Sequence, residues 1–312
     1  MFRRYLSIIV AIIVVTVLMV FTISIKQKQQ NDNKGIAEKL VNKAGIIIKN
    51  NECGEYGKFF SEKGIVPPVT VDLTQKHYKG IVLYYDNNKV YHPKAWESFE
   101  YLSDYIVDKS GNLYIVPMPF ISISSNTFNF LQNLYRVDTN TGELSIFMHF
   151  NDIKPSSTNP FGLNAITYDC DDDTLWVSAI DESDYVTQRG VIYHINPKNK
   201  KILSKFEGWD ALALTIFKMK KDKFLFLGSA KDNGFYMAKI NKNNIGKPIK
   251  LFEIPNPQEH IQKIIIHENN EIEIKTIPFS YTLIAESSDK DGNYYKAIYK
   301  NTTNKWSLEK IE

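Results

Sequence analysis

The stretch that decides the fold is YIVDKSGNLYIV, residues 105–116. Two short runs of β-branched and aromatic residues flank a polar turn that contains Gly111 and Asn112. Such runs favour strands, and Asp, Gly and Asn tolerate the positive φ angles that tight hairpin turns need. The stretch therefore predicts an antiparallel hairpin with its turn at residues 108–112.

This hairpin pattern recurs three more times along the chain. The second strand of each copy begins near residues 113, 175, 224 and 272. A second type of hairpin follows each copy, with turns that begin at residues 138, 196, 241 and 300. Two hairpins make a unit of four strands, and four-stranded units of roughly 40–50 residues are typical of a β-propeller.

The units give an expected blade count. They cover residues 65–100, 101–150, 160–208, 209–256 and 258–312. The first is the least regular and needs VTVDL, residues 69–73, as its missing strand. We therefore expect an all-β propeller with five four-stranded blades, while a sixth blade would require residues 36–62. A β-sandwich or two smaller β domains are the alternatives, but neither demands two alternating hairpin types.

The N-terminal segment predicts a membrane anchor. Residues 5–25 carry no charge, and about 21 helical residues span about 31 Å, close to the thickness of a hydrocarbon core. A cleaved signal peptide is the alternative, but the apolar run is long and ends without a small-x-small site. Arg3 and Arg4 precede the segment, so the positive-inside rule places residues 1–4 in the cytoplasm and the remainder outside it, periplasmic or extracellular.

The predicted organisation follows from that anchor. Residues 26–62 form a polar stalk and a short helix, with apolar positions on one helix face between residues 36 and 44. Residues 63–312 form the propeller domain. The bilayer is thus the expected partner of residues 5–25.

Charge and cysteine content narrow the function classes. The 312 residues include 38 basic and 35 acidic side chains, for a formal charge of +3. This near-balance and the lack of a basic run with interleaved aromatics exclude nucleic acid as an expected partner. The two cysteines, Cys53 and Cys170, lack the spacing of a zinc site. They are either two isolated thiols or, outside the cytoplasm, a disulfide.

The turn at residues 169–173 is unusually acidic, with four aspartates. Such a turn attracts cations, but acidic turns are more often simply solvated. We therefore expect a solvated turn and no bound ion.

Several motifs resemble one class of propeller. Asp108-x-x-Gly111-Asn112 followed by LYIV, LYRVD at residues 134–138, and GLNAI at residues 162–166 are similar to elements of NHL-repeat and SMP-30 (gluconolactonase, strictosidine synthase-like) propellers. The resemblance covers roughly residues 100–215 and is at the level of the fold, because these motifs mostly report hairpin geometry.

The hydrolase branch of that family implies a metal site. There, Glu, Asn and Asp side chains hold a divalent ion in the central channel, and the matching positions are Glu100, Asn164 and Asp210. Oxygen ligands of this kind suit Ca²⁺. Ala165 and Ala211 stand where the family often has Gly, which puts the site in doubt.

The long loops predict a binding face. The loops at residues 117–132 and 178–189 follow equivalent strands, so they should gather on one face with the crossings at residues 149–163 and 206–210. Loops on a rigid scaffold often carry binding residues, and aromatics and Arg are frequent anchors. The candidates are Phe120, Phe128, Phe130, Tyr185, Arg189 and Trp209.

These patterns favour a binding protein over an enzyme. There is no Walker motif, no dinucleotide fingerprint and no Gly-x-Ser-x-Gly elbow. We expect a membrane-tethered propeller that binds a small ligand or a protein through its loop face, without catalysis and without a cofactor. The alternative is a Ca²⁺-dependent lactonase or esterase of the SMP-30-like class. A structural subunit of a membrane complex is a third possibility, although the uncharged residues 5–25 look like a simple tether.

Overall fold

The computed structural model describes residues 48–50, 53–54, 57–65, 69–73, 79–86, 89–119, 126–219, 221–267, 271–282, 292–300, 303 and 305–311. The predicted membrane segment, the polar stalk, the helix at residues 36–44 and Phe120 lie outside these ranges. Within the described residues, no helix has the length and apolar character needed to cross a bilayer.

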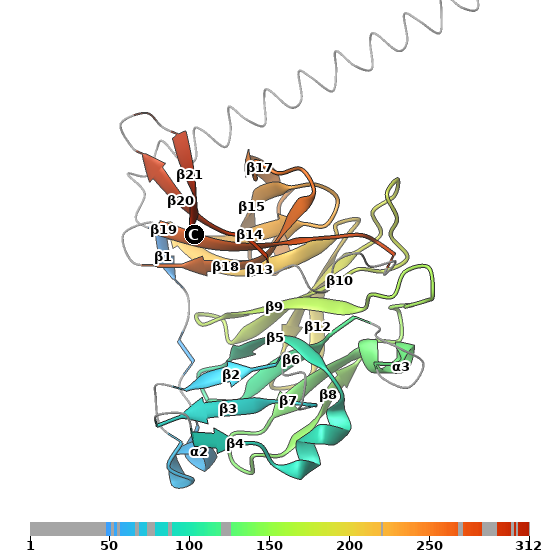
Figure 1. The fold of residues 1–312 in the computed structure, drawn as a ribbon, viewed down its shortest axis with the longest axis vertical. Helices are drawn as coiled ribbons and strands as arrows, with labels where there is room; N and C mark the ends of the chain where they lie inside the picture. The colour runs from blue at the N-terminus through green and yellow to red at the C-terminus, as the bar shows by residue number, and fades with distance from the viewer. Residues whose placement is uncertain are drawn as a thin grey trace, which may run out of the picture.

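Five antiparallel sheets make up the body (Figure 1). The first strands of consecutive sheets lie against one another, as β5 does with β9, β9 with β13, and β13 with β18. The sheets follow the five units expected from the repeats, and we call them blades 1 to 5. The fold is therefore an all-β five-bladed propeller, and the sandwich and two-domain alternatives are wrong.

Blades 1 to 3 are built from the first half of the body. Blade 1 has three described strands: β2 (Thr70–Asp72), β3 (Val82–Tyr85) and β4 (Lys89–Tyr91). Blade 2 has four: β5 (Leu102–Val107), β6 (Leu113–Pro117), β7 (Asn133–Val137) and β8 (Leu144–His149). Blade 3 also has four: β9 (Leu163–Asp169), β10 (Thr174–Ala179), β11 (Val191–Asn196) and β12 (Lys201–Glu207).

Blades 4 and 5 complete the set. Blade 4 contains β13 (Ala211–Met219), β14 (Asp222–Ser229), β15 (Gly234–Asn241), β17 (Ile249–Glu253) and the short β16 (Asn244–Ile245). Blade 5 contains β18 (Glu259–Ile266), β19 (Glu271–Pro278), β20 (Tyr294–Lys300) and β21 (Lys305–Ile311). Among the residues that the structure describes, three short helices lie between strands: α2 (Lys58–Glu62), η1 (Lys94–Phe99) and α3 (Phe128–Leu131).

Strand composition decides how the blades pack. The second strands of blades 2, 3 and 4 are continuous apolar runs that are buried on both faces, as expected for strands sandwiched between neighbouring sheets. In β19 of blade 5, buried and partly exposed residues alternate along Glu271–Pro278. This period-2 alternation gives blade 5 one buried and one partly solvated face.

The hydrophobic core lies between neighbouring blades. Four clusters of buried side chains join blade 1 to 2, 2 to 3, 3 to 4, and 4 to 5. Among the described residues, no such cluster joins blade 5 to blade 1. Blades 1 and 5 lie at opposite ends of the view in Figure 1, and we call the region between them, where this cluster is missing, the seam.

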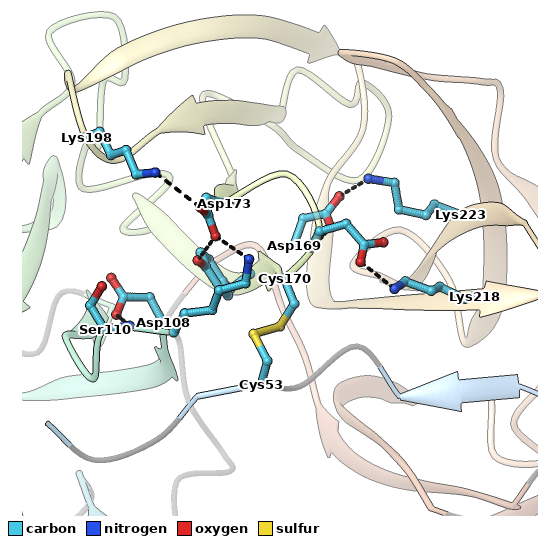
Figure 2. Close-up of polar contacts among 12 residues, drawn as sticks. Cys53, Asp108, Ser110, Asp169, Cys170, Asp173, Lys198, Lys218 and Lys223 are labelled. Carbon is cyan, nitrogen blue, oxygen red and sulfur yellow. Dashed lines mark hydrogen bonds and ion pairs between the residues drawn. A yellow bond between two sulfur atoms is a disulfide. The ribbon is translucent and has the colours of Figure 1, made fainter.

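An N-terminal strand and a disulfide tie the start of the body to the middle blades. Strand β1 (Ile48–Asn50) pairs antiparallel with the end of β13 in blade 4, so this part of residues 36–62 extends blade 4 and does not begin a sixth blade. Cys53 then bonds to Cys170 in the first turn of blade 3, with Cα atoms 5.9 Å apart (Figure 2). The prediction of two isolated thiols is therefore wrong.

The acidic turn of blade 3 is not simply solvated, which corrects the expectation from the sequence. Its carboxylates pair with lysines from neighbouring turns and strands: Asp173 with Lys109 and Lys198, Asp169 and Asp172 with Lys223, and Asp171 with Lys218 (Figure 2). These pairs join blades 2, 3 and 4 on the face where the hairpin turns lie, beside the disulfide.

Candidate functional site

A cavity of about 930 Å³ is lined by residues from all five blades. Blade 1 contributes Thr70 to Leu73, and blade 5 contributes residues of both β18 and β19, so the cavity reaches from the central channel into the seam. This volume lies in the range of small-molecule sites. A smaller cavity of about 60 Å³ continues between the first strands of blades 2 to 5.

A repeated β-bulge shapes the cavity wall. In blades 2 to 5, the register between the first and second strand shifts at one residue near the loop face. The bulged residues are Ser103, Asn164, Leu212 and Gln262. All four line the cavity. A bulge re-aims a side chain relative to the regular pleat, and here it occurs once in each of four blades.

The residue after each bulge sets the charge of the channel. In blades 3 and 4 this residue is a buried alanine, Ala165 or Ala213. In blades 2 and 5 it is Asp104 or Lys263, and both line the cavity. The two alanines pack in the hydrophobic clusters that join blades 3 and 4 and blades 4 and 5, whereas Asp104 and Lys263 bring opposite charges to the cavity wall.

Asp104 lies in a desolvating environment. Its Oδ2 accepts a hydrogen bond from the backbone N–H of Ile166 at 3.2 Å. Burial raises the pKa of Asp104, although the nearby positive charge of Lys263 and the hydrogen bond from Ile166 act in the opposite direction. Asp104 therefore holds a proton to higher pH than an exposed aspartate does.

The loop end of the cavity combines apolar and polar side chains. Met118, Pro119, Phe161 and Phe279 line it, and the rings of Phe161 and Phe279 lie 5.1 Å apart. Gln258, Ser280 and Thr282 line the same end. The strand registers place Lys263 and its partner Lys275 nearer the middle of the blade, so the two lysines lie farther inside than this loop end.

Asp210 organises the loops around this opening. The carboxylate is fully buried and accepts hydrogen bonds from Ser183 Oγ at 2.6 Å, the Gly190 N–H at 2.8 Å and Tyr281 OH at 2.7 Å. Burial raises its pKa, although these three donors lower it. At Gly190, a Cβ would lie 2.3 Å from Asp210 Oδ1, so only glycine fits there. Asp210 thus connects loops of blades 3 and 5.

The three residues implied as metal ligands make protein contacts. Glu100 forms an ion pair with Lys79 at 2.7 Å, and the Asn164 amide donates to the carbonyl oxygens of Ala211 and Leu212. Asn164 lines the cavity, whereas Glu100 and Asp210 do not. In the part of the chain that the structure describes, no group of three or more His, Cys, Asp or Glu side chains is placed to hold a metal. The carboxylates at Glu100 and Asp210 thus already have protein partners, and metal binding stays a prediction.

The residues predicted on the loop face separate into two kinds. Phe130 packs on Tyr135 with ring centroids 4.9 Å apart, and Trp209 packs on Tyr236 at 4.8 Å, so both support the core. Phe128 is half-buried in α3. The two others are exposed: Arg189 pairs with Glu182, and Tyr185 is 63% exposed. Its hydroxyl lies 2.5 Å from Ser280 Oγ, and Ser280 lines the cavity, so Tyr185 is at the rim.

Sequence reasoning missed most of the cavity lining, including Ser103, Asp104, Gln262, Lys263 and Lys275. One signal was present. Asp104 and Lys263 each directly precede an apolar run of a first strand, residues 105–107 and 264–266, so a charge stands at the equivalent place in two blades.

Fold and cavity define this chain as a five-bladed propeller with a ligand-sized central cavity. No family model matches the chain, and no curated protein matches it. Solved structures with a similar fold include a glucose dehydrogenase, with 10% identity over 72% of this chain and 79% of that chain and a TM-score of 0.41. A proposed gluconolactonase has 11% identity over 79% of this chain and 93% of the other, with a TM-score of 0.42. This likeness is at the level of the fold and assigns no function.

Proposed function

We propose that the protein is a membrane-tethered, extracytoplasmic propeller that binds a small ligand in the cavity, without catalysis. The observation that supports this proposal is the cavity of about 930 Å³ to which all five blades contribute. The cavity wall combines apolar side chains, among them Met118, Phe161 and Phe279, with polar groups that include the bulged Ser103, Asn164 and Gln262, and this combination is typical of ligand sites.

The proposed location rests on separate grounds. The uncharged residues 5–25 suit a bilayer span. The disulfide between Cys53 and Cys170 supports a position outside the cytoplasm, because disulfides persist in oxidising compartments. Protease added to intact cells should therefore digest the propeller domain, and protection of that domain would contradict the topology.

Binding is tested by filling the cavity. Gln262 is exposed, lies on the bulge and lines both cavities, so Gln262→Trp should occupy the space without disturbing the core. The full chain in lipid nanodiscs would be screened by thermal shift against a library of water-soluble metabolites. Compounds that stabilise the wild type should not stabilise Gln262→Trp.

A matched control separates cavity filling from a general effect of tryptophan. Lys310 is exposed on β21 of the same blade and does not line the cavity, so Lys310→Trp should respond to compounds as the wild type does. Stabilisation of all three proteins by the same compounds would contradict binding in the cavity. Turnover of phenyl acetate or δ-valerolactone by the purified protein would contradict the non-catalytic assignment and support the hydrolase.

A further inference from the structure

Two lysines lie directly opposite each other inside the cavity. Lys263 of β18 and Lys275 of β19 are register partners in an antiparallel pair, and both line the cavity. Side chains on directly opposed residues of neighbouring strands approach closely, and like charges there are destabilising. Lys263 is exposed and Lys275 is half-buried, so water screens part of this repulsion, and a bound counter-charge would relieve the rest.

The described protein groups compensate these lysines only in part. Neither lysine forms a salt bridge with a carboxylate among the residues that the structure describes, whereas lysines 218, 223 and 250 each do. The Lys275 ammonium lies 5.9 Å from the centre of the Tyr294 ring, which is a weak compensation. Two carboxylates, Asp72 and Asp104, also line the cavity. Lys263 lies near enough to Asp104 to act against the rise of its pKa, but burial is the larger effect and favours the neutral form of Asp104.

The side chains at the loop end of the cavity indicate the chemistry of the rest of the ligand. Phe161, Phe279 and Met118 line the end toward the loops, and the registers place the lysine pair farther inside. A ligand that fits both ends has a charged group at one end and an apolar or aromatic body at the other.

We propose that the cavity binds a small amphiphilic anion, whose carboxylate or phosphate group lies between Lys263 and Lys275 and whose apolar part packs against Phe161 and Phe279. This inference rests on the proposed ligand-binding function. Two ammonium groups supply up to six donors to one oxyanion, and such charge-assisted hydrogen bonds are among the strongest available to a protein.

Calorimetry with three aromatic probes tests the charge requirement. Benzoate, phenyl phosphate and neutral benzyl alcohol would be titrated into the full chain in lipid nanodiscs. At least one anion should bind at least tenfold more tightly than benzyl alcohol, and the preferred anion would distinguish a carboxylate from a phosphate ligand. Equal binding of all three probes would overturn the inference.

Variants of the lysines locate the interaction. Lys263→Gln/Lys275→Gln should lose at least tenfold in anion affinity and leave the affinity for benzyl alcohol unchanged. Lys310→Gln removes an exposed lysine from the same sheet and should bind anions as the wild type does. Anion binding that is unchanged in the double variant would place the anion elsewhere and overturn the inference.

A stability measurement separates a binding role from a structural role. Since the two lysines repel each other, Lys275→Gln should unfold at the same temperature as the unliganded wild type or higher, and a clearly lower midpoint would overturn the inference. Failure of the two proposals is distinguishable. Compounds that fail to bind Gln262→Trp but bind Lys263→Gln/Lys275→Gln as they bind the wild type would overturn the anion assignment alone. A wild type that binds no compound would overturn both the anion assignment and the ligand-binding function.

Discussion

Asp210 is the centre of a hydrogen-bond network among the loops. Its buried carboxylate accepts hydrogen bonds from Ser183, Gly190 and Tyr281. Asp210→Ala would leave these donors without their acceptor in a site closed to water, so we expect a loss of about 3 kcal/mol in the free energy of unfolding. Urea unfolding of the purified wild type and of the variant measures this loss of unfolding free energy.

The partners of Asp210 give graded controls. Ser183→Ala and Tyr281→Phe each remove one donor and keep the acceptor, so each should cost only about 1 kcal/mol. If Asp210→Ala cost no more than these single-donor variants, the carboxylate would not be the centre of the loop network.

Asp173 makes the stability of the protein depend on pH. The ion pair with Lys109, then the hydrogen bond from Tyr168, lower the pKa of Asp173 to about 2 from a usual value of 3.8. A folded-state pKa below the unfolded value stabilises the fold above the unfolded pKa, and this stabilisation is lost as the pH falls from about 4 to about 2. The contribution should be about 1 kcal/mol after allowance for solvent screening.

The comparison that isolates Asp173 uses Asp173→Asn. The difference in unfolding free energy between the wild type and this variant should shrink as the pH is lowered from 6 to 2.5, because the protonated wild type comes to resemble the variant. Urea midpoints at each pH give this difference. A constant difference across the range would show that Asp173 titrates normally.

At the scale of elements, the disulfide anchors the N-terminal strand and the acidic turn together. It closes a loop with a sequence separation of 117 residues, and the chain-entropy estimate for such a loop is about 4 to 5 kcal/mol. Dithiothreitol should therefore lower the unfolding midpoint of the wild type, and Cys53→Ser/Cys170→Ser should unfold near the reduced midpoint.

The double variant is also the control for the reductant. It has no bond to reduce, so dithiothreitol should leave its unfolding curve unchanged. A wild type whose midpoint does not respond to reduction would contradict a stabilising role for the disulfide.

At the scale of the whole molecule, the local hairpin chemistry made the blades predictable. Asp108 shows why: its Oδ1 accepts the N–H groups of Ser110 and Asn112 at 2.8 and 2.9 Å, and Gly111 has a φ of 85°. The turn therefore forms from residues that are adjacent in sequence, and the hairpins repeat with it. The order of apolar and polar residues along each strand then indicated which of its faces are buried.

The cavity was harder to predict because it depends on pairing across strands. Gln262 and Asn164 line it because of bulges, and a bulge is defined by the register of two strands, not by one. The Cys53–Cys170 bond depends on the path of the N-terminal segment across the turn face. The hydrogen-bond network of Asp210 was also hidden from the sequence, because one of its donors, Tyr281, lies 71 residues further along the chain.

The absence of a core cluster at the seam, among the described residues, predicts uneven stability around the ring. Strands β10 and β14 are buried along most of their length. One face of β19 is partly solvated, and β4 is mostly exposed. Regions with fewer buried contacts open at lower free energy. Hydrogen exchange should therefore be faster in β4, β20 and β21 than in β10 and β14.

Ligand binding extends this prediction. Blades 1 and 5 both line the cavity, so a compound that contacts both of them should slow exchange in the strands beside the seam more than in β10 and β14. Mass spectrometry of exchanged peptides, with and without a compound that stabilises the wild type, measures both effects, and Gln262→Trp is the matched control. Uniform exchange across all five blades in the absence of ligand would mean that the seam is packed as tightly as the other blade interfaces.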